Sequence, residues 1–416
     1  MKQEEICNKL KKYHQEHVIK LIEQVSPEKR EELLDQLSHI NLEQIQELYE
    51  DTKKAPKVNV SCLKPIQAVN PEKLTQKEKE EYIQLGENVI RNGQFAVATM
   101  SGGQGTRLGF DGPKGTFQIE VEPEPKYLFE IIIDTLKRAN KTYEVTIPWY
   151  IMTSKENNEA IIRFMEEKNY FGYPKDAVKF FEQGELPLID TKGRLLIDEQ
   201  KNIKQASNGN GSIFESMYEK GILQDMKQKD IKWVYIGSID NVLLKMVDPS
   251  LMGIAIKQNS LIATRSIFKN NPRERIGSLC SQNGKIKVIE YSELPEEMIE
   301  AVDENGELLF GESHVMCNLF HIDALEKVSK KRLPYHLAFK KYSYLDEQGN
   351  IVIPDEPNAY KFEYFIFDAF EYFEQISILR GIREEDFAPV KNKEGVDSPQ
   401  TAAKLYNTYW AKKNKK

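Results

Sequence analysis

The chain has 416 residues, of which 40% are hydrophobic and 10% aromatic, so it is long enough to bury more than one core. Its 58 Lys and Arg residues stand against 65 Asp and Glu residues, and no basic stripe interrupts this balance. This composition argues against nucleic acid as a partner, because a general nucleic-acid binder carries an excess of cations.

The chain also argues against a membrane partner. No apolar run approaches the roughly 18 residues that cross a bilayer, and the N-terminal residues lack the apolar core of a secretory signal. The four cysteines, Cys7, Cys62, Cys280 and Cys317, are scattered without a paired spacing. We therefore expect reduced thiols in a cytoplasmic protein, not a zinc site or a disulfide framework.

The first predicted segment, residues 1–91, is helical. Ser26 followed by Pro27 is a helix start signal, because the hydroxyl can cap the first turn and proline fits the first helical position. Asn41 can cap the next helix, and apolar residues recur at helical spacing after both positions. The short polar joint between the two predicts an αα-hairpin.

From Gln94 onward, short apolar runs alternate with helical patterns. The predicted strands are residues 94–100, 148–153, 178–181 and 233–236, and the predicted helices between the first three strands are residues 127–140 and 156–168. Strands that alternate with helices of this length form a parallel sheet covered on both faces. The fold class is therefore α/β, with a doubly wound, mostly parallel sheet.

A hairpin is predicted next to this sheet. Residues 278–282 return through Asn283 and Gly284 into residues 285–291, and an Asn-Gly pair suits a tight primed turn. Such an antiparallel annex commonly forms one wall of a substrate cleft. The predicted domains are a helical N-terminal segment over 1–91, a central α/β domain over 92–340 and a small mixed C-terminal domain over 341–416.

A glycine-rich loop follows the first predicted strand, where open α/β sheets bind ligands. It comprises Ser101, Gly102, Gly103, Gln104 and Gly105. Glycines without Cβ atoms let backbone N–H groups approach phosphate oxygens closely. The alternative is that the loop only makes a tight corner.

Two cations accompany this loop. Arg107 and Lys114 add local positive charge, which a phosphate ligand needs in an acidic protein. The loop has neither the Gly-Lys-Ser/Thr tail of a P-loop nor the GxGxxG spacing of a dinucleotide site. The sequence therefore predicts a phosphate site of another kind.

Several motifs in chain order carry a resemblance to a known family. They are residues 101–109 with 113–115, 180–187, 208–211, 238–241, 288–293, 360–363 with 367–368, and 387–392. Together they resemble the UDP-sugar pyrophosphorylases, and most of all the eukaryote-type UDP-N-acetylglucosamine pyrophosphorylases, between about residue 90 and about residue 403. The resemblance implies a Rossmann-like nucleotidyltransferase sheet in the central domain. It also implies a reaction in which UTP and a sugar 1-phosphate give a UDP-sugar and pyrophosphate.

The resemblance also implies roles for individual residues. Those implied to bind UTP are Ser101, Gly102, Gly103, Gln104, Gly105, Lys114, Gln183, Gly209, Asp240 and Lys361. Those implied to bind the sugar phosphate are Asn210, Glu290, Tyr291, His314 and Lys391. Arg107, Lys114 and Lys391 are the predicted catalytic cations. Asp240, at the end of a predicted strand, is the predicted ligand of a Mg²⁺ cofactor, which prefers one or two carboxylates together with substrate phosphates.

Two positions depart from the family pattern. Asn208 replaces an aspartate, and His314 stands where the N-acetylglucosamine enzymes carry an asparagine. The second departure leaves the sugar open: N-acetylglucosamine 1-phosphate is favoured, and glucose 1-phosphate or several hexose phosphates are the alternatives. His314 could also be a buried core residue, because side chains alternate along a strand.

Ordinary structural roles remain the alternatives for single residues. Asp240 could cap a helix, Lys361 and Lys391 could be surface lysines, and residues 208–211 could be a plain turn. A non-enzymatic nucleotide-sugar sensor on the same fold is the competing function. The presence of Arg107 and Lys114 favours catalysis over that alternative.

Overall fold

The computed structural model describes residues 3–54 and 62–414, and the contacts within it form two compact units. Unit 1 combines Met1–Lys57, Gly184–Ser212 and Leu333–Ile366, whereas unit 2 combines Val58–Gln183, Ile213–Arg332 and Phe367–Lys416. These contacts cut the chain at other points than the predicted ranges 1–91, 92–340 and 341–416, and parts of the first and last range lie outside the described residues. The three-domain division stays a prediction.

Unit 1 consists of helices and short strands. Its elements are α1 (Gln3–Lys12), α2 (Glu16–Gln24), α3 (Pro27–His39), α4 (Leu42–Thr52), β7 (Glu185–Pro187), β8 (Ile189–Asp190), β9 (Gln205–Ser207), β15 (Tyr335–Lys340), β16 (Tyr344–Leu345), β17 (Ile351–Val352) and β18 (Ala359–Tyr364). The order β15–β18–β8 forms an antiparallel sheet, and β7 pairs with β9. Apolar side chains of the four helices, among them Leu33 and Leu37, pack with Ile189, Leu195 and Phe362 in one core.

The predicted helix starts in this unit are confirmed. The Ser26 hydroxyl accepts a hydrogen bond from the N–H of Lys29, and the Asn41 amide oxygen accepts one from the N–H of Gln44. Each cap satisfies an N–H group that the first turn of a helix leaves without a partner.

Unit 2 contains the large sheet and the helices around it. Its elements are β1 (Leu63–Pro65), α5 (Gln76–Arg91), β2 (Phe95–Met100), β3 (Gln118–Ile119), β4 (Lys126–Tyr127), α6 (Leu128–Tyr143), β5 (Trp149–Thr153), α7 (Asn158–Glu167), β6 (Val178–Glu182), α8 (Ile213–Glu219), α9 (Ile222–Gln228), β10 (Trp233–Ser238), α10 (Pro249–Lys257), β11 (Ile262–Phe268), β12 (Ser278–Gln282), β13 (Lys285–Ile289), α11 (Glu296–Ile299), β14 (Glu312–His321), α12 (Ile322–Ser329), β19 (Ser377–Arg380), α13 (Arg383–Asp386) and α14 (Pro399–Lys413).

The parallel part of the sheet runs in the order β6–β5–β2–β10. Counted along the chain, this is the order 3-2-1-4 of a doubly wound sheet, in which the direction of winding reverses between β2 and β10. Every residue of β2 and β5 is buried, which explains their continuous apolar sequences. The predicted α/β class, parallel sheet and N-terminal helices are confirmed.

An antiparallel part extends the sheet beyond β10. Strand β14 pairs with β10, β11 and β12, and β12 continues into β13 through Asn283 and Gly284, which both have positive φ. Positive φ at both turn residues is the primed turn that the Asn-Gly pair predicts. Strand β13 ends at Ile289, two residues earlier than predicted, because Glu290 begins a turn in which its carbonyl accepts from the N–H of Glu293.

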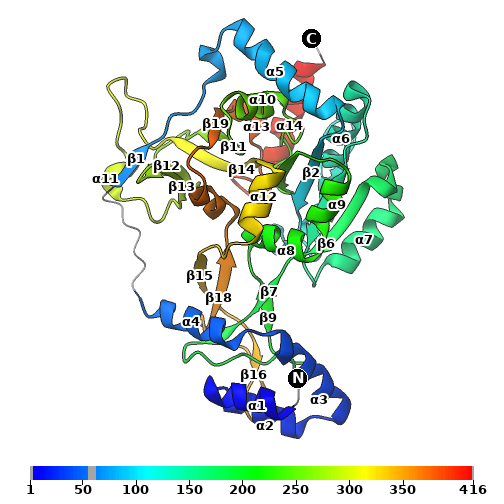
Figure 1. Cartoon of the computed structure of the whole chain (residues 1–416), viewed down its shortest axis with the longest axis vertical. Helices are drawn as coiled ribbons and strands as arrows, with labels where there is room; N and C mark the ends of the chain where they lie inside the picture. The colour runs from blue at the N-terminus through cyan, green and yellow to red at the C-terminus, as the bar shows by residue number, and fades with distance from the viewer. Residues whose placement is uncertain (1–2, 55–61, 415–416) are drawn as a thin grey trace. The chain divides into compact units, whose positions relative to one another are not determined.

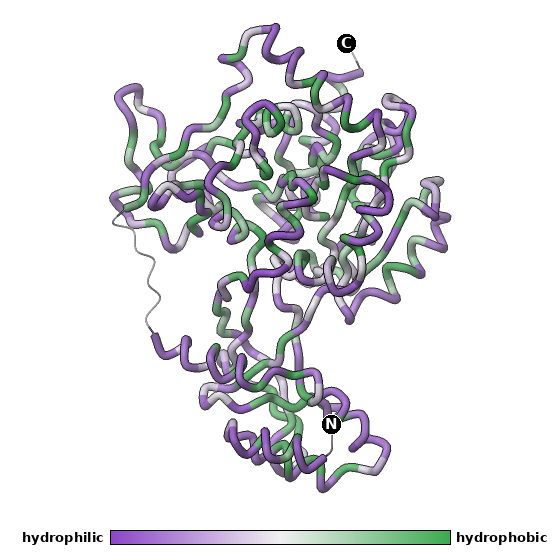
Figure 2. The backbone as a smooth tube through the Cα atoms, in the orientation of Figure 1, coloured by the Kyte–Doolittle hydropathy of each residue, from purple (hydrophilic) through white to green (hydrophobic). Residues whose placement is uncertain are grey.

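Helix α5 lies in unit 2, apart from the four helices before it. A Cβ atom at Gly86 would lie 2.1 Å from the carbonyl oxygen of Pro249 on α10, and one at Gly253 would lie 1.8 Å from that of Tyr82 on α5. Only glycine permits this approach of two helices. In Figure 2 the hydrophobic colour gathers in the interior of each unit. In the described part of the chain, no helix combines the length and apolar character that crossing a membrane requires.

Candidate active site

The glycine-rich loop begins where β2 ends, beside the point at which the winding of the sheet reverses. Backbone hydrogen bonds close the loop on itself: the N–H of Lys114 donates to the Gly103 carbonyl at 3.1 Å, and the N–H of Gly105 donates to the Gly112 carbonyl at 2.9 Å. The loop is therefore held in one conformation by its own backbone.

Several polar groups of this loop have no protein partner. Within residues 3–54 and 62–414, the backbone N–H groups of Gly102, Gly103 and Gln104 meet no hydrogen-bond acceptor. The buried Oγ of Ser101 and Oε1 of Gln104 are likewise without a partner in this part of the chain. Buried polar groups normally find partners, so their arrangement suits a ligand that supplies both acceptors and donors, such as a nucleoside phosphate.

Gln183 lies against this loop, immediately after β6. A Cβ atom at Gly102 would lie 2.5 Å from Gln183 Nε2, so only glycine leaves room for the amide where it is. Gln183 is 9% exposed, and its backbone N–H donates to the Thr153 carbonyl. The structure thus brings together the loop and Gln183, one of the residues predicted to bind UTP.

Asp240 follows β10 and faces two lysines. Lys114 Nζ lies 3.5 Å from Asp240 Oδ2. Burial alone raises the pKa of the Asp240 carboxyl, but the cations of Lys114 and Lys391 outweigh this effect and hold the pKa below its ordinary value. The predicted UTP-binding lysine, the predicted metal ligand and the predicted sugar-phosphate lysine therefore form one electrostatic cluster.

Arg107 and Lys391 are the less enclosed cations. Arg107 is exposed in the short 3₁₀ turn Thr106–Leu108, and within the described residues no carboxylate lies at ion-pair distance from it. Lys391 Nζ lies 3.9 Å from Asp397 Oδ2 and 5.5 Å from the centre of the Phe387 ring. Both cations can therefore turn toward a phosphate without breaking a close ion pair.

Two asparagines that the sequence did not single out hold these segments in place. Asn157, 1% exposed, donates to the Ser101 carbonyl and accepts from the N–H of Ser154. Asn241 donates to the Asp386 carbonyl at 2.7 Å and accepts from the N–H of Ala388 at 2.9 Å. The signal for Asn241 was its place directly after the predicted metal ligand.

The segment after Asn241 explains how Lys391 is positioned. The N–H of Val390 donates to the Asp240 carbonyl at 2.8 Å, and the N–H of Val242 donates to the Ala388 carbonyl at 3.1 Å. Together with Asn241, these bonds fasten the segment leading to Lys391 along the end of β10. Residues that are distant in the sequence are thereby fixed side by side.

The remaining predicted UTP residues belong to unit 1. Gly209 has a φ of 89°, and an added Cβ would lie 2.4 Å from the Tyr364 carbonyl oxygen, so this position requires glycine. Lys361 on β18 forms an ion pair with Glu363 at 2.8 Å.

Two asparagines flank Gly209. The amide oxygen of Asn210 accepts from the N–H of Ile366 at 2.8 Å, which leaves its amide nitrogen as the group able to contact a sugar. Asn208 is 4% exposed, and its Oδ1 has no partner among the described residues. The ligand roles of residues 209 and 210 stay predictions.

Glu290 and Tyr291 lie just beyond β13. Tyr291 is 43% exposed, so its ring is available to a ligand, and Glu290 is partly buried. The structure leaves both sugar-binding roles as predictions.

His314 occupies a buried position on β14. Its Nε2 lies 2.8 Å from Asn318 Oδ1, and its ring packs edge-on against Phe367 and Phe370. Met316 between the two polar residues has a φ of 57°, and the pairing with β11 shifts register there. This environment is that of a buried core residue, and the sugar-contacting role of His314 remains a prediction.

Replacing His314 with asparagine tests both interpretations. Burial lowers the pKa of His314 to about 4, although the bond to Asn318 raises it, against 6.5 for a free imidazole. Between those pH values the imidazole of the unfolded chain binds a proton that the folded protein excludes. The free energy of unfolding of the wild-type protein therefore falls by up to about 3 kcal/mol as the pH is lowered through this range.

We expect His314→Asn to lower the thermal midpoint at pH 7, because the smaller side chain leaves a cavity. The variant should also lose less stability than the wild type as the pH falls below about 6.5, because it lacks the buried imidazole. His39→Gln, at an exposed histidine, is the control. If the thermal midpoints of wild type and His314→Asn change with pH in parallel, His314 is not a buried neutral imidazole. A changed ratio of kcat/KM between two sugar 1-phosphates would support the sugar-contacting role.

A doubly wound sheet that presents a glycine loop and a cluster of lysines where its winding reverses can bind a nucleoside triphosphate and neutralise its charge, as a nucleotidyltransferase requires. Comparison with known proteins gives the same class. Residues 4–402 match the UTP–glucose-1-phosphate uridylyltransferase family, and the chain belongs to this family. The resemblance to UDP-sugar pyrophosphorylases is thus confirmed.

Individual relatives are more specific in name. The chain is 33% identical to UDP-N-acetylglucosamine diphosphorylase 2 of Arabidopsis thaliana, over 96% of this chain and 82% of that protein. It is 35% identical to the UDP-N-acetylglucosamine pyrophosphorylase of Saccharomyces cerevisiae, over 92% of this chain and 85% of that protein. The solved uridine diphosphate N-acetylglucosamine pyrophosphorylase of Trypanosoma brucei matches with a TM-score of 0.81 and 26% identity, covering 97% of this chain and 84% of the other.

Proposed function

We propose that this protein is a uridylyltransferase that joins UTP to N-acetylglucosamine 1-phosphate, with release of pyrophosphate. The observation that carries the proposal is the cluster of Lys114, Asp240 and Lys391 beside the glycine loop. The names of the relatives from Arabidopsis thaliana and Saccharomyces cerevisiae support this sugar. Glucose 1-phosphate is the second candidate, because the description of the family names it.

The reaction requires no nucleophile from the protein. A phosphate oxygen of the sugar phosphate attacks the α-phosphorus of UTP, a new P–O bond forms, and the bond to the β-phosphate breaks as pyrophosphate leaves in line. The attacking group is already an anion, so catalysis rests on positioning and on charge neutralisation.

The residues divide this work as follows. The N–H groups of Gly102, Gly103 and Gln104 bind phosphate oxygens, and Lys114 and Arg107 neutralise charge on the triphosphate. Lys391 holds the sugar phosphate for attack. In the same proposal, Gln183 recognises uracil with its amide donor and acceptor.

Further residues complete the proposed substrate contacts. The remaining UTP contacts are Ser101, Gly105, Gly209 and Lys361, and the sugar contacts are Asn210, Glu290 and Tyr291.

Asp240 fits a role in holding Mg²⁺. Within the described residues, no group of three or more histidines, cysteines, aspartates or glutamates could hold a metal ion, so an ion here would rely on one or two carboxylates and on substrate phosphates, as Mg²⁺ does. The ionised state of Asp240, held by Lys114 and Lys391, suits this role. A bound Mg²⁺ supplies neutralisation of charge on the phosphates.

We also propose a cytoplasmic location. Cys280 and Cys317 are buried free thiols, and this supports a reducing compartment. Fractionation with an antibody against the protein tests the location. A secreted or organelle-bound pool would contradict it.

Recognition of the base can be tested through Gly102. In Gly102→Ala the new Cβ would lie 2.5 Å from Gln183 Nε2, so the amide must move while the fold is retained. We expect KM for UTP to rise by about tenfold or more and the preference for UTP over ATP to fall, because a displaced hydrogen-bonding group no longer discriminates between bases.

The matched control is Gly103→Ala, since no atom lies within 4 Å of a Cβ at Gly103. It leaves Gln183 in place, so any effect should be the same for UTP and ATP. An unchanged preference for UTP in folded Gly102→Ala would contradict the assignment of Gln183 to uracil.

A further inference from the structure

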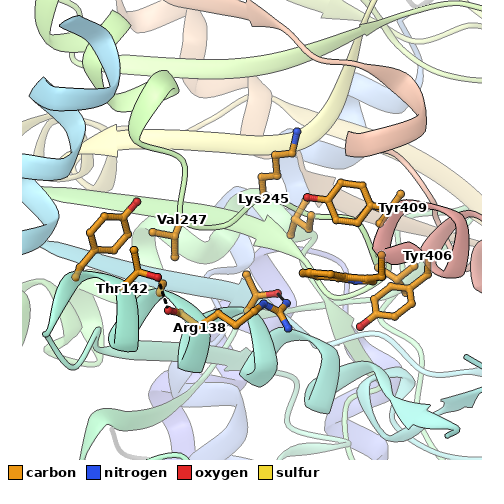
Figure 3. Close-up of a pocket in the computed structure, with 13 residues that line it drawn as sticks. Arg138, Thr142, Lys245, Val247, Tyr406 and Tyr409 are labelled. Atoms are coloured by element: carbon orange, nitrogen blue, oxygen red, sulfur yellow. Dashed lines mark hydrogen bonds between the residues drawn. The ribbon is translucent and has the colours of Figure 1, made fainter. Parts of the chain in front are cut away.

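A second cavity lies in unit 2, on segments distinct from the glycine loop. Its volume is about 290 Å³, and helix α6, the segment after β10 and helix α14 line it. Figure 3 shows Arg138 and Thr142 on one side, Lys245 and Val247 on another, and Tyr406 and Tyr409 presented by α14. This volume is at the lower end of the range for small-molecule sites, roughly 300 Å³ and above.

The charge of this cavity has one sign. Among the described residues that line it, the charged ones are Arg138 and Lys245, both cations. The Arg138 guanidinium lies 4.2 Å from the centre of the Trp410 ring, and within residues 3–54 and 62–414 no carboxylate is at ion-pair distance from it. Its other polar contact is to the hydroxyl of Thr135, at 3.1 Å. An exposed arginine held on an aromatic face, without an acidic partner, suits an anion.

The aromatic walls add a flat surface and a donor. Tyr409 and Trp410 pack edge to face at 5.1 Å, and Tyr143 of α6 also lines the cavity. The buried indole N–H of Trp410 has no acceptor with full hydrogen-bond geometry in the described chain. It approaches the Tyr406 hydroxyl only weakly. This approach lowers the pKa of Tyr406, but burial raises that pKa by more. A planar ligand can stack on these rings and accept this hydrogen bond.

We propose that this cavity is a second binding site, for a small organic anion with a planar body, and that its occupation lowers turnover. Lys245 connects the cavity to the proposed active site: its Nζ lies 3.0 Å from Asp386 Oδ1 and 3.6 Å from Glu385 Oε2, and the Asp386 carbonyl accepts from Asn241, which fastens the segment leading to Lys391. An anion in the cavity competes with Asp386 for Lys245 and loosens this anchor. The effect on turnover rests on the proposed role of Lys391, whereas binding itself does not.

Binding is tested with 8-anilinonaphthalene-1-sulfonate, a planar sulfonate whose fluorescence rises on binding. We expect saturable binding to the full chain with one site, and about three- to tenfold weaker binding to Arg138→Gln. Arg163→Gln, at an exposed arginine of α7, is the matched control and should bind as wild type does. The uncharged analogue N-phenyl-1-naphthylamine should not distinguish the variants. Equal sulfonate affinity for wild type and Arg138→Gln overturns the site.

Coupling is tested by titrating the sulfonate at increasing UTP alone and, separately, at increasing sugar 1-phosphate alone. Two coupled sites change each other's affinity by the same factor, so the apparent Kd of the sulfonate should rise to a plateau as the substrate concentration increases. The sulfonate should also lower kcat less in Arg138→Gln, because this variant binds it more weakly. An apparent Kd that rises without limit means that the probe occupies the substrate site, and an unchanged Kd means no coupling. Either result overturns the proposal, and neither depends on which sugar the enzyme prefers.

Discussion

Lys114→Ala is expected to lower kcat by about two to three orders of magnitude, as loss of one preorganised charge donor does. Lys114 is the cation nearest to Asp240, and its side chain is only 16% exposed, so water cannot replace it fully. Arg107→Ala should have a similar effect, although Arg107 is more exposed. Steady-state kinetics with UTP and N-acetylglucosamine 1-phosphate measure both variants.

Two further variants make this test specific. Lys141→Ala, at an exposed lysine of α6, should leave kcat unchanged. Lys114→Arg keeps the charge but changes its shape, and we expect partial activity. Near-normal turnover in folded Lys114→Ala would show that Lys114 does not act on the triphosphate.

Asp240→Asn is the second substitution for which we expect a large effect. It removes the negative charge that Lys114 and Lys391 share and the only carboxylate proposed to hold Mg²⁺. We expect kcat/KM to fall by about two to three orders of magnitude, and the Mg²⁺ concentration for half-maximal activity to rise. A titration of activity against Mg²⁺ measures the second effect.

Asp397→Asn is the matched control. Asp397 also lies near Lys391, at 3.9 Å, and its φ of 58° is one that asparagine tolerates. It should alter activity several-fold at most and leave the Mg²⁺ dependence unchanged. If the two variants respond alike to Mg²⁺, Asp240 does not hold the ion.

The parallel sheet could be predicted because burial on both faces leaves continuous apolar runs in β2, β5 and β10. The glycine loop could be predicted because its composition is unusual. The approach of Asp240 to Lys391 could not, because it depends on hydrogen bonds between segments far apart in the chain. The sequence predicts no role for Asn157 or Asn241 for a related reason: a buried, hydrogen-bonded asparagine has the same sequence signal as an exposed loop asparagine.

The position of His314 illustrates a second limit. Alternation along a regular strand would have assigned its face. The positive φ at Met316 and the register shift between Thr264 and Ser266 interrupt that alternation in β14. No sequence pattern indicates such an irregularity, so the environment of His314 could be seen only in the structure.

Pyrophosphate release from UTP, measured with a panel of sugar 1-phosphates, tests the proposed reaction and the proposed sugar together. We expect the highest kcat/KM with N-acetylglucosamine 1-phosphate, and little release of pyrophosphate when ATP or GTP replaces UTP. A higher kcat/KM with glucose 1-phosphate would contradict the proposed sugar. A folded protein that binds UTP and releases no pyrophosphate with any sugar 1-phosphate would contradict the proposed reaction itself.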